Sequence, residues 1–347
     1  MGKRTWGWTA CLAIIVAIIL GLGGFGFASP LEKQLYEAAK KEGNLEYWDS
    51  LSVKEISDLW KGFEKKYPGI KLKYFEATTD VREEKYLTEH NAGRHTADII
   101  PIDLYAKYKE KGLLLNLSDI INDAGYPKKY CPKDLDAVAL EHLLIGTAYN
   151  TNLIAPKDAP KSWDDLLDPK WKGKITVERR MKYFIYITDF WGEAKVIDYL
   201  KKLSKQNPSF NNGVTATLAL VGAGELPMAI GMYFGRTLFD QKKGMPIEWA
   251  NLSPLVDKLT PYVAMRYAPH PNAAKLFLYW WMSPEGSIYV DSLRNKGNPE
   301  PGSGTLTSKA IDKKGRPEIH VVPSWSVLDE DVLEKKYLEA VGYRKQK

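Results

Sequence analysis

Cysteine is almost absent from this sequence, because Cys11 and Cys131 are the only two among 347 residues. Cys11 lies in an N-terminal segment that we expect to be removed, so Cys131 is left alone and no intrachain disulfide can form. The chain also lacks a Gly-x-Ser-x-Gly elbow, a His-Glu-x-x-His helix and a paired-cysteine motif. Without them neither a hydrolase site nor a zinc site can be assembled. We therefore expect a protein that is not an enzyme and carries no cofactor.

Long blocks of one charge are absent as well. Lys and Arg number 49, Asp and Glu number 43, and the net charge of +6 is spread along the chain, which argues against nucleic acid as a partner. Hydrophobic residues make up 44% and charged residues 27%, the proportions of an ordinary globular protein. The length predicts two domains.

The longest apolar run occupies residues 10–20. It follows the basic residues 3–4 and leads to small residues at Gly26 and Ala28, an order typical of a secretory signal peptide. We predict cleavage before Ser29, which makes residues 1–28 a signal peptide and the mature protein periplasmic. An uncleaved membrane anchor is the alternative, because the apolar stretch that continues to Ala28 approaches the length of a membrane span.

Strands and helices alternate along the rest of the chain. Ser52 and Glu55 have capping-box spacing and predict a helix over 53–66, which Pro68 and Gly69 end. The alternation of such helices with short apolar strands predicts an α/β fold with a mostly parallel sheet. The other expected strands are 44–48, 70–74, 97–102, 143–149, 174–177, 228–232 and 260–266, and the other expected helices are 82–91, 193–204 and 272–282.

Seven short segments carry a family resemblance through their order and spacing. They are YEAAKKEG at 36–43, FEKKYPGI at 63–70, AGRHTAD at 92–98, AYNT at 148–151, WDDLLDPKWKGK at 163–174, APHPNAA at 268–274 and SPEG at 283–286. With these segments behind a signal peptide, the chain resembles the extracellular solute-binding proteins of bacterial ABC importers, in the branch that contains the ferric-ion-binding proteins.

This resemblance implies a two-lobed periplasmic-binding-protein fold of type II, with a two-strand hinge near 146–150 and 260–265. Lobe 1 is then expected to comprise 29–146 and about 265–300, and lobe 2 about 147–264, with residues 301–347 packing on the lobes. The implied function is capture of a small solute between the lobes and its delivery to an ABC permease in the inner membrane. We expect a monomer, because closure of the lobes needs no second subunit.

Polar residues follow the expected strands at the positions where α/β sheets bind ligands. The hydroxyl groups of Ser50 and Ser52, and the free N–H groups of the helix that follows them, suit an anionic group. Ordinary turn or helix-cap roles are the alternative for each of them. The residues are Ser50, Ser52, Thr78, Thr79, Asp103 and Thr215.

The resemblance also implies what a ferric site would need. Ferric-binding relatives use adjacent tyrosines after a strand of the second lobe, a carboxylate, and often a histidine from the first lobe. The matching pair here is Tyr233 and Phe234, Asp103 falls near the carboxylate position, and Ser52 stands where the histidine would be. Two of four protein ligands are therefore kept, which predicts weak or no binding of Fe(III).

We instead predict a small organic anion, held by Ser50, Ser52 and Thr215, with Tyr233 and Phe234 packing on its body. Arg236 would add a charge-assisted contact. The alternative is ferric iron bound by Tyr233 and Asp103. Two alternatives of another class are that the ligand-loaded protein docks to a membrane sensor in place of a permease, and that the chain is a periplasmic enzyme.

Overall fold

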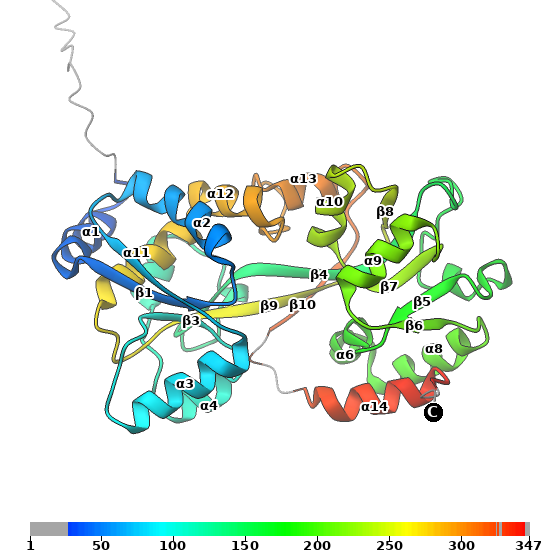
Figure 1. Cartoon of the computed structure of the whole chain (residues 1–347), viewed down its shortest axis with the longest axis horizontal. Helices are drawn as coiled ribbons and strands as arrows, with labels where there is room; N and C mark the ends of the chain where they lie inside the picture. The colour runs from blue at the N-terminus through cyan, green and yellow to red at the C-terminus, as the bar shows by residue number, and fades with distance from the viewer. Residues whose placement is uncertain (1–26, 324, 326–327, 344–347) are drawn as a thin grey trace, which may run out of the picture.

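Two α/β lobes lie side by side in the computed structural model, which describes residues 27–323, 325 and 328–343 (Figure 1). Residues 1–26, most of the predicted signal peptide, lie outside the described residues. Within the described part of the chain, no helix is long and apolar enough to cross a membrane. The predicted α/β class and the two lobes are confirmed.

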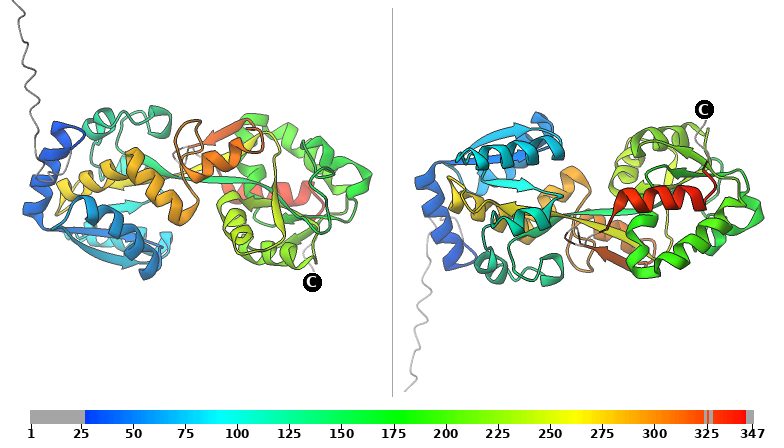
Figure 2. Two further views of the ribbon diagram at one scale, coloured as in Figure 1. Left: turned by 90° about the horizontal axis from the view of Figure 1, so that it is seen from above. Right: turned by 90° about the horizontal axis from the view of Figure 1, so that it is seen from below.

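Lobe 1 contains a parallel sheet in the order β2, β1, β3, which continues through the antiparallel strand β9. Helices cover both faces of this sheet, with α1, α2 and α11 on one side and α3 and α4 on the other (Figures 1 and 2). Its elements are α1 (Pro30–Glu42), β1 (Asn44–Asp49), α2 (Val53–Lys66), β2 (Lys71–Glu76), α3 (Thr79–Asn91), β3 (Ile99–Pro101), α4 (Tyr105–Glu110), α5 (Ser118–Asp123), η1 (Lys128–Tyr130), α11 (Pro271–Met282) and α12 (Pro284–Arg294).

The helix predicted over 53–66 is α2, and its capping box is present. The Ser52 side chain accepts from the backbone N–H of Glu55, and the Glu55 carboxylate accepts from the backbone N–H of Ser52. Its apolar stripe is buried, and Phe63 packs edge-on against Phe277 of α11 with ring centres 5.2 Å apart. The periodicity of the sequence thus places one face of α2 in the lobe 1 core.

Lobe 2 repeats the arrangement with the parallel strands β7, β5 and β6. Its core lies in two layers, under α6 and α8 on one face and under α9 and α10 on the other. Its elements are η2 (Asp164–Leu167), η3 (Pro169–Trp171), β5 (Ile175–Glu178), α6 (Lys182–Tyr186), α7 (Thr188–Trp191), α8 (Glu193–Ser204), β6 (Ser209–Asn211), α9 (Val214–Ala223), β7 (Met228–Tyr233), α10 (Phe234–Lys242) and β8 (Ile247–Ala250).

Two long antiparallel strands, β4 (Val138–Asn150) and β9 (Leu255–Ala264), run from one lobe into the other (Figure 1). The pairing partners show where each strand enters the second of its two lobes. β9 already pairs with β3 of lobe 1 from Tyr262 onward, and β4 already pairs with β7 of lobe 2 from Ile145 onward. The alternating pattern of the sequence identified both strands, but the pairing partners decide where each strand leaves its lobe.

The C-terminal segment adds a third strand to this hinge and then returns to lobe 2. The strand β10 (Ile319–Val322) pairs in parallel with β9, whereas the resemblance had implied two hinge strands. Before it, α13 (Leu306–Asp312) packs through Ile311 on lobe 2. After it, α14 (Glu330–Ala340) packs on α8 and α6 (Figure 2).

Candidate functional site

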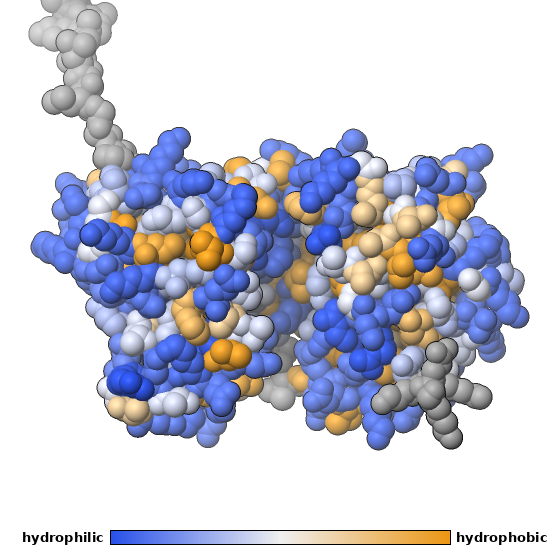
Figure 3. All heavy atoms as spheres, in the orientation of Figure 1, coloured by the Kyte–Doolittle hydropathy of each residue, from blue (hydrophilic) through white to orange (hydrophobic). Residues whose placement is uncertain are grey.

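A groove separates the two lobes on the face shown in Figure 3. The carboxyl ends of the parallel strands in both lobes point toward it, and so do the N-termini of α2, α3, α9 and α10 (Figure 1). The strand-end residues predicted from the sequence therefore lie around this groove. Ligands of α/β sheets bind at such edges.

A cavity of about 440 Å³ lies at the floor of the groove. Asp103 of lobe 1, Tyr233 of lobe 2 and Lys258 of the hinge line it, so all three parts of the molecule contribute. Its volume is within the range of about 300 to 1,000 Å³ that small-molecule sites occupy. Further lining residues are Leu143, Lys182, Tyr186, Val322, Pro323, Leu328 and Glu330.

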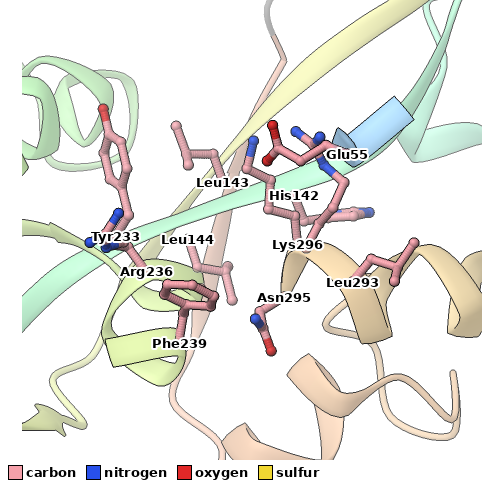
Figure 4. A pocket seen from close by; sticks show the side chains of 12 residues that line it. Glu55, His142, Leu143, Leu144, Tyr233, Arg236, Phe239, Leu293, Asn295 and Lys296 are labelled. Atoms are coloured by element: carbon pink, nitrogen blue, oxygen red, sulfur yellow. The ribbon is translucent and has the colours of Figure 1, made fainter. Parts of the chain in front are cut away.

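A second hollow of about 250 Å³ adjoins the first and shares Tyr233 and Leu143 with it. Arg236 and Phe239 of α10 face it from lobe 2, and Lys296 faces it from the segment after α12 (Figure 4). The interlobe space is thus wider than one ligand-sized cavity.

Tyr233 ends β7 and is half-buried between the two hollows. Burial raises the pKa of its phenol, and the nearby Arg180 guanidinium, which bonds to it, opposes that rise. The phenol is therefore neutral near pH 7 and can donate a hydrogen bond to a ligand in the cavity.

Arg180 lies beside Tyr233 and was not singled out by sequence reasoning, although neither hollow is lined by it. Its Nε donates to Glu178 at 2.8 Å, and Glu178, only 1% exposed, also accepts from the backbone N–H of Gly213 at 3.2 Å, just before α9. A buried carboxylate thus fixes the guanidinium beside Tyr233. The position of Glu178 at the end of an expected strand could have indicated this pair in the sequence. The aromatic residues that follow instead made the segment look like part of the hydrophobic core.

Asp103 and Lys258 connect lobe 1 to the hinge. The Lys258 ammonium lies 3.3 Å from the Asp103 carboxylate, whose side chain is 56% exposed. On the other wall, Lys182 pairs with Glu330 of α14. Each lysine that lines the cavity therefore has a carboxylate partner already.

Three of the four predicted hydroxyl residues of lobe 1 form local hydrogen bonds. Ser52 donates to Glu55 at 2.7 Å as part of its capping box, and Ser50 donates from its backbone to Asp49. Thr79 accepts from Arg82, while Thr78 begins α3 without a side-chain cap. All four lie at the groove edge, but neither hollow is lined by them.

In lobe 2 the structure separates the three remaining predicted residues. Phe234 is 2% exposed and packs edge-on against Trp249 with ring centres 5.0 Å apart, so its ring belongs to the core and the expectation that it packs on a ligand is corrected. Arg236 lines the smaller hollow and pairs with Asp240 at 2.7 Å. Thr215 is exposed in the first turn of α9.

The residues of the ferric hypothesis are only partly assembled. Tyr233 and Asp103 line the same cavity, whereas the position of a second phenolate is occupied by the buried Phe234 ring. Among the described residues, no group of three or more His, Cys, Asp or Glu side chains is arranged to hold a metal ion.

The chain is similar in sequence to known proteins. A family model described as bacterial extracellular solute-binding protein matches residues 43–288. An uncharacterized protein of Haemophilus influenzae is 26% identical over 156 residues, which is 41% of this chain and 44% of that protein, so the chain spans less than half the length of this relative.

Solved structures share the fold over most of both chains. The substrate-binding protein of an ABC transporter from Agrobacterium tumefaciens is 17% identical with a TM-score of 0.65, over 87% of this chain and 96% of that one. Iron-bound HitA from Pseudomonas aeruginosa is 19% identical with a TM-score of 0.61, over 86% and 99%. AfuA from Actinobacillus pleuropneumoniae, with fructose-6-phosphate bound, is 20% identical with a TM-score of 0.57, over 87% and 99%. At these identities the likeness concerns the fold.

Proposed function

The chain belongs to the family of bacterial extracellular solute-binding proteins, and from this premise we propose that it captures a small organic anion between its lobes and delivers it to an ABC permease of the inner membrane. The resemblance found in the sequence motifs is confirmed by the family match. Removal of residues 1–28, a periplasmic location and a monomeric state belong to the same proposal.

The observation that carries the choice of ligand is the guanidinium of Arg180, fixed by the buried Glu178 beside Tyr233. A guanidinium has five N–H donors, and the Glu178 contact occupies the one on Nε. The terminal nitrogens suit the two oxygens of a carboxylate or phosphate. Tyr233 adds a neutral donor and an aromatic ring for the body of the ligand.

The ferric alternative has weaker support. Fe(III) needs several anionic oxygen ligands. The phenols of Tyr186 and Tyr233 and the carboxylates of Asp103 and Glu330 line one cavity, but Glu330 is already paired with Lys182. Asp103 is already paired with Lys258, and the Tyr233 phenol lies beside Arg180. Among proteins of the same fold, HitA was solved with iron and AfuA with fructose-6-phosphate, so both ligand classes fit the architecture.

Native mass spectrometry of the freshly isolated protein is the first experiment, because it shows the mass of what the cleft carries. Candidate anions are then screened by thermal unfolding, where a ligand at 100 times its dissociation constant should add about 2.7 kcal/mol of stability. We expect Arg180→Gln to weaken binding about 10-fold or more, since a hydrogen bond to a charged group contributes about 1.5 to 3 kcal/mol.

Arg179→Gln is the matched control, because Arg179 precedes Arg180 but bonds to Asn212 instead of Glu178, and it should bind normally. A protein that carries stoichiometric iron with a visible charge-transfer band, both lost in Tyr233→Phe, would establish the ferric alternative. If the ligand-loaded protein binds a partner other than the permease, such as a sensor kinase, the ligand stays as proposed but the protein serves sensing in place of import.

A further inference from the structure

Three buried polar atoms without a hydrogen-bond partner gather at the outer end of α3. They are the Tyr86 hydroxyl, Nδ1 of His90 and Nδ1 of His95, and none has a partner among the described residues. Tyr86 is fully buried, and its ring stacks on that of His90. Buried polar atoms are nearly always paired, so three in one cluster call for an explanation such as a bound ion.

The two imidazole rings are close to each other and to one tyrosine. Their centres are 5.2 Å apart, and the Tyr267 ring lies 4.7 Å from His95 and 5.6 Å from His90. In a tetrahedral site with metal-to-nitrogen bonds of about 2.0 to 2.1 Å, two imidazole centres lie about 5 Å apart. The spacing of 5.2 Å between the His90 and His95 ring centres matches that of two ligands of one ion, and it is also a spacing at which aromatic rings pack.

Aromatic stacking alone does not account for histidine at both positions. A phenylalanine would stack as well without burying a nitrogen, whereas each unpaired buried polar atom costs about 1 to 3 kcal/mol. A metal ion would provide the missing partner for both nitrogens. Glu89, the carboxylate next to His90 in the sequence, already bonds to Lys85 and Thr96. A metal ion at this place would therefore be bound by imidazole nitrogens more readily than by this carboxylate.

We propose that His90 and His95 bind a divalent transition-metal ion of the kind that prefers imidazole, such as Zn²⁺, Cu²⁺ or Ni²⁺. Water and the Tyr267 phenol can fill the remaining positions. This site is separate from the interlobe cleft, because α3 begins at the groove with Thr79 and runs outward (Figure 1), and its 13 residues span about 20 Å.

The test uses the untagged exported protein, stripped of metal with a chelator and titrated with Zn²⁺ or Cu²⁺ alone by calorimetry. We expect one equivalent to bind, and the electron paramagnetic resonance spectrum of the Cu²⁺ form to show two coupled nitrogens. His90→Phe and His95→Phe keep the ring stack but lose the nitrogens, so each should weaken binding about 10-fold or more. Lowering the pH through the range where histidine is protonated should release the ion.

His320→Phe is the matched control. His320 also stacks on an aromatic ring, that of Phe190, but its Nε2 bonds to Asp189, so metal affinity should not change. The proposal is overturned if no stoichiometric binding occurs, or if the double variant with phenylalanine at both positions binds as well as the unaltered protein. Folding of each variant is checked by its thermal unfolding, and a variant that unfolds is replaced by His95→Gln. Anion binding in the cleft is measured in the same samples, and its presence or absence leaves this result unaffected.

Discussion

A buried carboxylate at the hinge allows a sharp prediction of how stability depends on pH. Glu141 of β4 is 5% exposed and forms ion pairs with Arg294 at the end of α12 and with Lys296, the latter at 3.0 Å. Burial alone would raise the pKa of Glu141, but the charges of Arg294 and Lys296 outweigh it and lower the pKa to about 2. The perturbation is Glu141→Gln, which keeps the shape of the side chain and removes its charge.

The magnitude follows from the pKa shift. An unfolded glutamate titrates at 4.5, so the folded state holds the carboxylate charged over a wider pH range than the unfolded chain does. The stabilisation of about 3 kcal/mol is fully present above pH 4.5 and is lost as the pH falls toward 2. At pH 7, Glu141→Gln leaves Arg294 without its anion, a defect that typically costs about 3 to 5 kcal/mol.

Urea unfolding at pH 7 and at pH 3 measures both effects. The Glu141→Gln variant should be less stable than the unaltered protein at pH 7. The difference between their free energies of unfolding should be smaller at pH 3. A variant that also carries Arg294→Met should recover part of the loss. Asp119→Asn is the control, because Asp119 pairs with Lys275 at a position that is 41% exposed, and it should change stability by less than about 1 kcal/mol. Equal losses of stability in Glu141→Gln and Asp119→Asn would show that the buried Glu141 ion pairs stabilise the fold no more than an exposed pair does.

The remaining predictions concern close packing and burial. Gly235→Ala should lower the free energy of unfolding by about 1 to 3 kcal/mol, because an added Cβ would lie 2.2 Å from the Asn295 carbonyl oxygen. It should also alter the lobe arrangement seen by small-angle scattering. An unchanged scattering profile and an unchanged stability would contradict this contact. Phe234→Tyr should lower the stability of the fold, since it forces a hydroxyl against Trp249 in the core. With Fe(III) this variant should show no charge-transfer band. A visible band would show that the ring reaches the cleft. Burial raises the pKa of Cys131 to about 12. A thiol reagent at pH 8 should therefore leave Cys131 unmodified until the protein is unfolded with urea. Rapid labelling of the native protein would contradict the burial of this side chain.

Local patterns predicted the elements of this fold well. The capping box at Ser52 and the apolar spacing after it depend only on neighbours in the chain, so the bounds of α2 could be read directly. The start of β9 at Leu255, ahead of the expected residue 260, could not, because residues 255–258 pair with β10, which lies more than 60 residues away in the sequence.

The site was harder to predict than the fold for the same reason. Tyr233 and Asp103 were found because both end strands, and the structure places them in one cavity. Phe234 was assigned to the cleft because it adjoins Tyr233, but successive residues at a strand end point in opposite directions, and its ring entered the core. Arg180 depends on a carboxylate and a helix start that the fold alone brings together.

The return of the chain to lobe 1 has a consequence for how the protein forms. Lobe 1 is completed by α11, whose Phe277 packs against Trp60 and Phe63 of α2, and whose first turn is capped by the Glu42 carboxylate. The four strands confined to lobe 2 all lie between α2 and α11 in the sequence. As the chain lengthens, the N-terminal helices of lobe 1 must therefore wait for α11 with their apolar faces uncovered. Lobe 2 can form its strands before that, but its core is completed only when α14 packs on α8 and α6. Each lobe thus depends on a helix that comes late in the sequence, and neither can bury its whole core before the chain is nearly complete.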